Sequence, residues 1–290
     1  MRSTYYKNLC IMQEMQLQLK KFDITSIADD KVVVLIGKRD TGKSVLVSDL
    51  LYYHRDIPIG TVISPTENAN EFYCKMVPDV FIHEDITSEL LANVLKRQKL
   101  IVKKKRKELK NHGKSKIDPR TFLILDDCLA DNKSWINDAT IRAMFYNGRH
   151  YKVLFIITCQ YPLGLPPNFR TNIDYVFILR ENLVANRRRI YDNYAGMFPS
   201  YEIFSQVMNQ CTENYECLVI HNNAKSNKIE DQVFWYKAEM HDSYKIGAHM
   251  FWEMQENMES SSDEEFFDAN FGRKKSKGPV IKVNKRTEYC

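Results

Sequence analysis

The chain has 290 residues, 44% of them hydrophobic and 12% aromatic, with a formal net charge of +5. This length and composition allow one large α/β domain with additions, and they exclude a small disulfide-stapled scaffold. The seven cysteines form no C-x-x-C pair, so no cysteine metal site is expected. The apolar runs fall well short of the ~20 residues of a membrane span, and the first residues lack the apolar core of a secretory signal. We therefore expect a soluble, intracellular protein with no membrane span.

The first predicted elements lead into a phosphate-binding pattern. Alternating apolar and polar residues over 15–22 predict a half-exposed edge strand. A buried strand is predicted over 32–36, the spacing G-x-x-x-x-G-K-S follows over 37–44, and apolar residues at helical spacing continue to residue 54. Strand, loop and helix together make the Walker A pattern. The residues expected to bind nucleotide are Gly37, Lys38, Arg39, Asp40, Thr41, Gly42, Lys43, Ser44 and Val45.

Each residue type in this loop has a chemical reason. Gly37 and Gly42 permit a positive φ and a close backbone approach to a phosphate, and the loop N–H groups point to an anion at a helix N-terminus. Lys43 is expected to neutralise the β- and γ-phosphates, and the Ser44 hydroxyl to ligate Mg²⁺. A plain glycine-rich turn explains the glycines but not the Lys-Ser pair. ATP and Mg²⁺ are therefore the expected cofactors.

A strongly basic helix follows the Walker A region. The pattern predicts strands over 61–64 and 79–83 with a short helix over 68–76 between them, and then a helix over 87–109. Residues 96–116 carry eleven Lys or Arg against one Glu, so the rest of the chain is net acidic. One interpretation is an ordinary solvated face. The other is a surface for phosphate backbones that is insensitive to sequence, since no aromatic residues interleave with the lysines.

Two adjacent acids form the second chemical landmark. An apolar strand over 121–125 delivers Asp126 and Asp127 to its carboxyl end, where α/β sheets place their ligands. In this Walker B interpretation Asp126 holds the Mg²⁺ shell, and Asp127 orients or deprotonates the attacking water. Two acids after a strand can also simply cap a helix. Their position after Walker A, with strands between, favours the catalytic interpretation.

The remaining elements complete a sheet. Gln160 ends a predicted strand over 151–160; it either caps that strand or, if the strand neighbours the Walker strands, positions water beside the γ-phosphate. The other predictions are a helix over 134–146, a proline-rich loop over 161–170, a strand over 172–179, a basic helix from 185, and an antiparallel pair over 215–221 and 232–236. The fold class is thus α/β: a P-loop, RecA-like, mostly parallel sheet flanked by helices, with antiparallel additions near the termini. We expect an ATPase domain over 1–257 and a charged, disordered tail over 258–290.

The landmarks resemble the FtsK/HerA-like branch of P-loop ATPases. More closely, the segments 36–44, 123–129 and 165–177 resemble the genome-packaging ATPase of nucleocytoplasmic large DNA viruses, including the poxvirus type. The resemblance covers residues 15–240. Walker A and Walker B are common to many families, and Gln160 with the Pro-Pro-Asn-Phe-Arg stretch narrows the match.

This resemblance implies a DNA-packaging motor. It implies a homo-oligomeric ring, a hexamer, that pulls double-stranded DNA into a capsid by ATP hydrolysis, with capsid or portal-region proteins as further partners. It places the protein in the host cytoplasm or viral factory and in the virion. Gln160 becomes the sensor, and an arginine must reach the neighbouring subunit's γ-phosphate, with Arg149 the first candidate and Arg170 the second. Asp127 departs from the Glu of the wider superfamily, and the membrane anchor and DNA-reading domain of cellular translocases are not expected.

Two other functions remain open from the sequence. A P-loop kinase or nucleotide-metabolising enzyme would need an acceptor pocket and lid arginines, and it would not need the second acid at position 127. A non-catalytic ATP-dependent switch would bind ATP and a partner without turnover.

Overall fold

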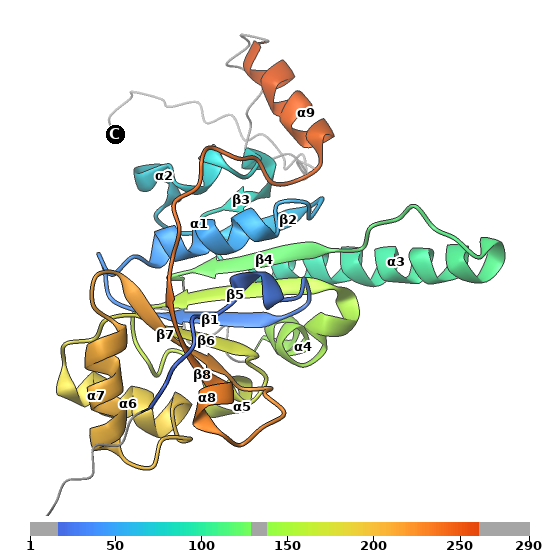
Figure 1. Cartoon of the computed structure of the whole chain (residues 1–290). Helices are drawn as coiled ribbons and strands as arrows, with labels where there is room; N and C mark the ends of the chain where they lie inside the picture. The colour runs from blue at the N-terminus through green and yellow to red at the C-terminus, as the bar shows by residue number, and fades with distance from the viewer. Residues whose placement is uncertain (1–16, 129–137, 261–290) are drawn as a thin grey trace, which may run out of the picture.

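In the part of the chain that the structure describes, an eight-stranded sheet in the order β3-β2-β4-β5-β1-β6-β7-β8 forms the centre (Figure 1). The computed structural model describes residues 17–128 and 138–260. The strands are β1 (Val32–Ile36), β2 (Gly60–Ile63), β3 (Ile82–His83), β4 (Thr121–Asp126), β5 (Val153–Cys159), β6 (Tyr175–Ile178), β7 (Glu216–His221) and β8 (Val233–Lys237).

Strand direction confirms the predicted fold class. In the strand order, the strands from β3 to β6 pair parallel with one another, whereas β7 pairs antiparallel with both β6 and β8. In the registers of β1, Val34 lies between Ile157 of β5 and Val176 of β6. Every residue of β1 and β5 is buried, as expected for strands covered on both faces. Strand β5 therefore lies between the Walker A strand β1 and the Walker B strand β4, the arrangement on which the role of Gln160 depends.

Helices cover both faces of the sheet. The helices are α1 (Lys43–Tyr53), α2 (Glu67–Asn70), α3 (Ser88–His112), α4 (Ala139–Asn147), α5 (Pro167–Arg170), α6 (Val184–Tyr194), α7 (Tyr201–Cys211), α8 (Ile229–Gln232) and α9 (His249–Ser260). Helix α1 packs its apolar side on one face, and α3, α4, α6 and α7 pack on the other. No helix within residues 17–128 and 138–260 combines the length and apolar character that crossing a bilayer requires.

Helix α3 is longer than the sheet it packs on. Thr87 caps its start by accepting a 3.1 Å hydrogen bond from the Leu90 N–H, and Gly113 ends it at φ 68° with its N–H bonded to the Leu109 carbonyl. Its buried side chains lie between residues 91 and 98, and from Lys99 to the end of the helix none is buried. The second half therefore projects from the domain, as Figure 1 shows at the end of α3.

Some sequence predictions differ from the structure. The predicted edge strand over 15–22 is wrong for its described part, because only Lys21 forms a bridge, to Trp235 in the edge strand β8. The strand predicted over 79–83 keeps two paired residues after a 3-10 turn, and the short helix over 68–76 splits into α2 and a second 3-10 turn at Tyr73–Lys75. Residues 134–137 of the predicted helix over 134–146 lie outside the described residues.

Four helices were not predicted: the four-residue α5 and α8, and the longer α7 and α9. Helix α7 precedes the antiparallel pair, and α9 runs across the predicted domain boundary at residue 258. The segment before α9 crosses the α1 side of the sheet, where the Tyr244 hydroxyl donates to the Ser48 carbonyl at 2.6 Å and the Ile246 N–H to the Met76 carbonyl at 2.8 Å. The division into a domain and a disordered tail stays a prediction, because residues 261–290 lie outside the described residues.

Candidate active site

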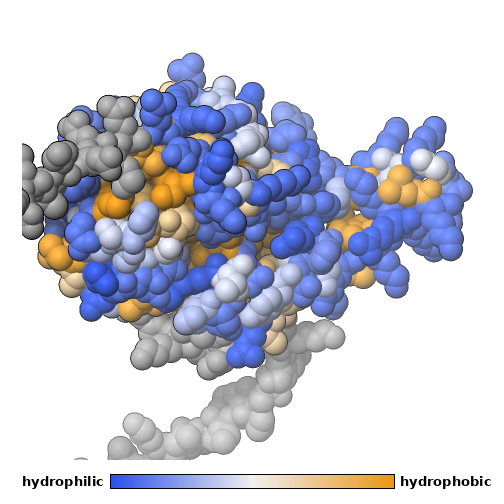
Figure 2. Space-filling view, turned by 60° about the horizontal axis from the view of Figure 1, so that its bottom comes forward, coloured by the Kyte–Doolittle hydropathy of each residue, from blue (hydrophilic) through white to orange (hydrophobic). Residues whose placement is uncertain are grey.

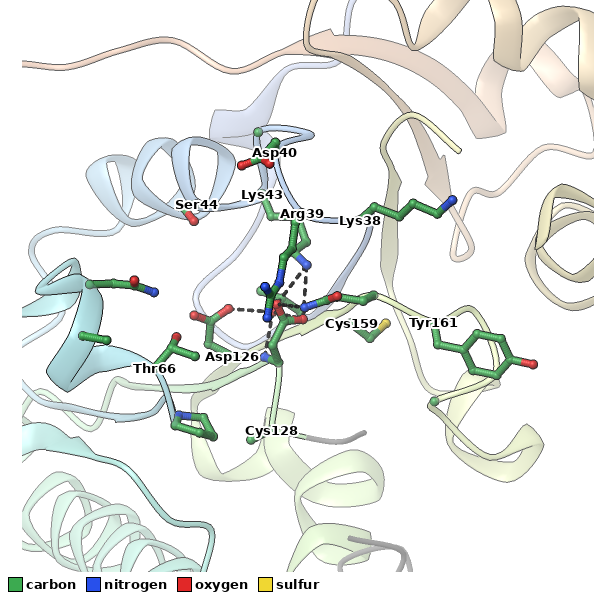
Figure 3. Close-up of a pocket in the computed structure, with 18 of the residues that line it drawn as sticks. Lys38, Arg39, Asp40, Lys43, Ser44, Thr66, Asp126, Cys128, Cys159 and Tyr161 are labelled. Atoms are coloured by element: carbon green, nitrogen blue, oxygen red, sulfur yellow. Dashed lines mark hydrogen bonds and ion pairs between the residues drawn. The ribbon is translucent and has the colours of Figure 1, made fainter. Parts of the chain in front are cut away.

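A cavity of about 1100 Å³ opens at the carboxyl edge of the parallel strands. Its walls come from the Walker A loop, from the ends of β4 and β5, and from the segments around α2 and residues 84–86. Figure 3 shows side chains from the loop, Walker B and β5 gathered around it. The predicted residues that line it are Lys38, Arg39, Asp40, Gly42, Lys43, Ser44, Val45, Asp126, Asp127 and Gln160. A volume of this size is that of a small-molecule or cofactor site.

The positive φ predicted for the two loop glycines is found at Gly42 and not at Gly37, where lack of space is what excludes a side chain. Gly42 has φ 97° and starts α1, and a Cβ at Gly37 would lie 2.7 Å from the Thr41 hydroxyl and 2.9 Å from the Leu179 Cβ. No side chain fits at such distances. Thr41 closes the loop internally by donating to the Lys38 carbonyl at 2.7 Å. The backbone can thus form a cradle with the first N–H groups of α1 free for an anion.

Helix α1 is held in place by a buried carboxylate in its own middle turn. Asp49 is fully buried, and its oxygens accept from the Tyr236 hydroxyl at 2.6 Å and from the Glu239 N–H at 3.1 Å. His241 Nε2 lies 2.6 Å from the other oxygen, and its ring stacks on Tyr52 at 3.7 Å. These contacts join the phosphate-loop helix to β8 and to the chain that follows it.

Lys43 points back across the loop to Walker B. Its ammonium donates to the Gly37 carbonyl at 2.8 Å and forms an ion pair with Asp127 at 2.9 Å. The residue is only 8% exposed, so its charge is held in a protein environment rather than in water. This cation is therefore fixed where a phosphate on the loop would meet it.

Asp126 is suited to hold a metal through its oxygens. One oxygen accepts a 2.6 Å hydrogen bond from Thr158 in β5, and the other lies 3.4 Å from the Ser64 hydroxyl at the end of β2. Burial raises the pKa of Asp126 and outweighs the lowering by the Thr158 hydrogen bond, and the neighbouring charge of Asp127 raises it further. A nearby cation would offset that cost, and Ser44 on the same cavity adds a second hard oxygen, as Mg²⁺ prefers. Within the part of the chain that the structure describes, no cluster of three His, Cys, Asp or Glu could hold a metal alone. That fits an ion held mostly by phosphates and water.

Asp127 lies at the junction of the three motifs. Its carboxylate accepts from Lys43 and also from the Gln160 amide at 3.0 Å, and its N–H donates to Thr158 Oγ1 at 3.0 Å. Its φ is 49°, a left-handed conformation that costs a non-glycine residue of order 1–3 kcal/mol. Walker A, Walker B and the end of β5 thus converge on one carboxylate.

Two residues of this arrangement were missed from the sequence. Thr158 links both acids, and Glu181, which follows β6, forms a 2.7 Å ion pair with Lys38 of the loop. Glu181 also accepts from the Leu183 N–H at 2.8 Å and from the Asn186 amide at 3.0 Å. Burial acts to raise the pKa of Glu181, but Lys38 and these donors lower it overall. The only sequence signal was a polar residue inside or directly after an apolar strand.

The two candidate arginines do not line the cavity. Arg149 is exposed in the 3-10 turn Gly148–Tyr151 before β5, at the opposite edge of the sheet from Gln160. Arg170 is engaged within the chain: Nε donates to the Leu165 carbonyl at 2.8 Å, Nη1 contacts Asn193, and the guanidinium lies 5.4 Å from the Tyr194 ring centre. A role in trans stays a prediction for both.

Both the sequence and the fold have known relatives. Uncharacterized protein L437 of Acanthamoeba polyphaga mimivirus is 42% identical over 93% of this chain and 97% of its own length. Uncharacterized protein 088R of Invertebrate iridescent virus 3 is 40% identical over 74% of this chain and 80% of its own. The fold is similar to that of the genome packaging NTPase B204 of Sulfolobus turreted icosahedral virus 2, solved in complex with ATP-gammaS. That match has a TM-score of 0.51 and 18% identity over 74% of this chain and 100% of the other. Residues 19–234 match the model of the Poxvirus A32 protein family, and the chain belongs to that family.

Proposed function

We propose that this protein is the ATP-hydrolysing motor subunit that moves double-stranded DNA into a viral capsid. The observation that carries the proposal is the convergence of Lys43 and Gln160 on Asp127, because it joins the phosphate loop to a water-directing pair of side chains. The relation to the A32 family and the fold shared with a genome packaging NTPase support the choice of DNA as the substrate. The expected place of action is the viral factory of the infected cell and the virion.

The residues of the site divide the chemistry between them. The loop N–H groups and Lys43 bind the phosphates, and the lysine exchanges its contact with Asp127 for one with the γ-phosphate. Ser44 and Asp126 would hold Mg²⁺, which neutralises charge developing on the β- and γ-oxygens when bound. Asp127, released from Lys43, accepts a proton from the attacking water, and the Gln160 amide orients that water.

The position of Arg149 supports action between copies of the chain. Strand β5 separates Arg149 from Gln160, and seven strand residues at ~3.3 Å each span about 23 Å. Arg149 can therefore reach a γ-phosphate only in a neighbouring copy, as in a homo-oligomeric ring, for which we propose a hexamer. Mixing Arg149→Ala subunits with Lys43→Ala subunits tests this. Each variant alone should be inactive, and the mixture should recover turnover at interfaces that combine an intact loop with an intact arginine; full activity of Arg149→Ala alone would contradict it.

The projecting half of α3 is the proposed DNA contact. Figure 2 shows this end of the molecule as mostly hydrophilic, and nine of the eleven Lys and Arg in 96–116 are exposed. Among the described residues, none of these eleven takes part in a salt bridge. Cations without acidic partners are available to phosphates, and their affinity would come from counterion release rather than from base contacts. Capsid or portal-region proteins are further proposed partners of the ring.

The first test of this function is ATP hydrolysis with and without double-stranded DNA at two salt concentrations. We expect DNA of any sequence to stimulate turnover and the stimulation to fade at high salt. Turnover that is unchanged by DNA and requires a small phosphate acceptor would indicate a kinase instead. ATP binding without turnover would indicate a switch.

A second test addresses α3 directly. Replacing Lys103, Lys107 and Lys110 by Gln keeps helix propensity and removes three exposed charges from one side of the helix. The slope of log affinity for DNA against log salt should fall by up to about three, at roughly 0.9 per lost phosphate contact. The matched control replaces the exposed Lys225, Lys228 and Lys237 by Gln. An equal loss in the control set would show that only net charge matters and that α3 is not the contact.

A further inference from the structure

Tyr215 lies where the sheet topology brings a second flank of the chain against the phosphate loop. Because β7 runs antiparallel to β6, the amino end of β7 lies at the edge where β1, β4 and β5 end. The residue before β7 is Tyr215, which lines the same cavity as Walker A and Walker B. Its Cδ1 lies 3.4 Å from the point that a Cβ on Gly42 would occupy. An aromatic ring therefore stands directly beside the start of α1.

The backbone holds this ring in an unusual way. Asn214 and Tyr215 have φ of 49° and 64°, and the Glu216 N–H closes the turn on the Glu213 carbonyl at 2.8 Å. Both central residues of the turn are left-handed, a conformation that favours Asn and Gly and that a tyrosine rarely adopts. Such strained residues cluster at ligand sites, where the surrounding structure imposes them. The turn thus places a tyrosine where glycine would be the less strained choice.

The ring is also left without partners. Tyr215 is 69% exposed, and among the described residues it makes no aromatic, cation–π or side-chain hydrogen-bond contact. Among the described residues the cavity has one other tyrosine, Tyr161 (Figure 3), and its ring does have a partner. The Arg189 guanidinium lies 5.6 Å from the Tyr161 ring centre. Tyr215 is therefore the cavity tyrosine whose ring is not already in contact with a cation.

The two flanks of the loop give the site a direction. Lys43 meets Asp127, and through it Gln160, on the side of β4 and β5, where the γ-phosphate is cleaved. Gly42 faces the other side, where its nearest neighbours are Tyr215 and Leu179, the residue after β6. A triphosphate with its γ end at Asp127 has its other end, which carries the sugar and base, toward Tyr215.

We propose that Tyr215 is a binding residue for the base of the nucleotide, stacking its ring on the base. Stacking uses the π-face that every base has, so this contact adds affinity with little discrimination between adenine and guanine. The inference rests on the nucleotide site and not on DNA translocation. A chain that binds ATP through Tyr215 but moves no DNA would leave it intact.

The test compares a ligand that has a base with one that has none. Dissociation constants for Mg²⁺–ATP, Mg²⁺–GTP and Mg²⁺–tripolyphosphate are measured without DNA on the full chain and on Tyr215→Ala, Tyr215→Phe and Tyr215→Trp. We expect Tyr215→Ala to weaken the binding of ATP and GTP by about 5- to 150-fold, the range for one stacked base. Tripolyphosphate should stay within about twofold, and the Phe and Trp variants should bind ATP like the native chain.

The control and the contrary outcomes separate stacking from other roles. Tyr146→Ala removes an exposed tyrosine that does not line the cavity and should change none of the three constants. An equal loss of ATP and tripolyphosphate in Tyr215→Ala would mean that the ring only shapes the loop. Unchanged ATP affinity in Tyr215→Ala, or a Phe variant as weak as the Ala variant, would equally overturn the proposal.

Discussion

Replacing Asp127 by Asn should separate ATP binding from ATP hydrolysis. The Asp127 carboxylate, 26% exposed, forms a 2.9 Å ion pair with the Lys43 ammonium, which is 9% exposed. At an effective dielectric of ~20 the Coulomb attraction at this distance is about 6 kcal/mol, and desolvation of the two charges offsets most of it. We take the net competition of this pair against the phosphate as about 1 kcal/mol, the upper end of the range for a partly exposed ion pair. The Asn variant should therefore bind a non-hydrolysable ATP analogue roughly fivefold more tightly.

The same substitution should nearly abolish turnover. Asparagine cannot accept the proton of the attacking water, and the loss of a positioned general base costs about 10²- to 10⁴-fold in rate. Titration calorimetry measures the binding, and phosphate release measures the rate. Asp242→Asn is the control, because it removes an exposed charge that does not line the cavity and should change neither quantity. Native turnover in Asp127→Asn would refute the general-base role, and weaker analogue binding would refute the competition between Lys43's two partners.

Three further substitutions test the surroundings of the site. Burial raises the pKa of Asp126, so its ionised form destabilises the fold as pH rises above the ordinary Asp range. Asp126→Asn should therefore raise the melting temperature of the nucleotide-free chain at pH 7. The same substitution should remove the stabilisation by Mg²⁺–ATP. The lowered pKa of Glu181 acts in the opposite sense, because its stabilisation is lost as pH falls through that pKa. Glu181→Gln should therefore lower the free energy of unfolding, measured with denaturant, by about 1 kcal/mol at pH 7 and by less at pH 3. The effect is small because Lys38 is 38% exposed and solvent screens the ion pair. A Cβ at Gly60 would lie 2.0 Å from the Phe122 ring, so Gly60→Ala should destabilise the chain by about 3 kcal/mol in the same measurement, and a neutral result would contradict this packing.

The elements predicted well are those whose burial is visible in the sequence as a run of apolar residues. Strands β1 and β5 are covered on both faces, so their sequences are continuous apolar runs that cannot be read as surface structure. The Walker A loop was predicted equally well, because a side chain at Gly37 would clash with its neighbours and Gly42 has a positive φ. The alternation of apolar and polar residues over 15–22 predicted a strand wrongly, because strand pairing depends on a partner segment that the local pattern does not contain. The partner of Lys21 is Trp235, more than 200 residues away in the sequence.

The parts of the site that could not be predicted depend on contacts between distant segments. Gln160 was expected beside the γ-phosphate only if β5 neighboured the Walker strands, and strand order is a property of the whole sheet. Glu181 and Tyr215 belong to other segments, and only the fold brings them to Lys38 and Gly42. For Arg149 the fold separates residues that are near in sequence. Arg149 precedes β5 and Gln160 follows it, so the two lie at opposite ends of that strand.

The most direct measurement of the proposed function is ATP-driven movement along double-stranded DNA. A short strand bound as a triplex at one end of a linear duplex is released when a motor passes through it. The proposal predicts release that needs Mg²⁺ and ATP, proceeds on duplexes of unrelated sequence, and is absent with Asp127→Asn. If the native chain hydrolyses ATP on that duplex but never displaces the third strand, it is a DNA-stimulated ATPase that does not translocate, and the motor function proposed for it is wrong.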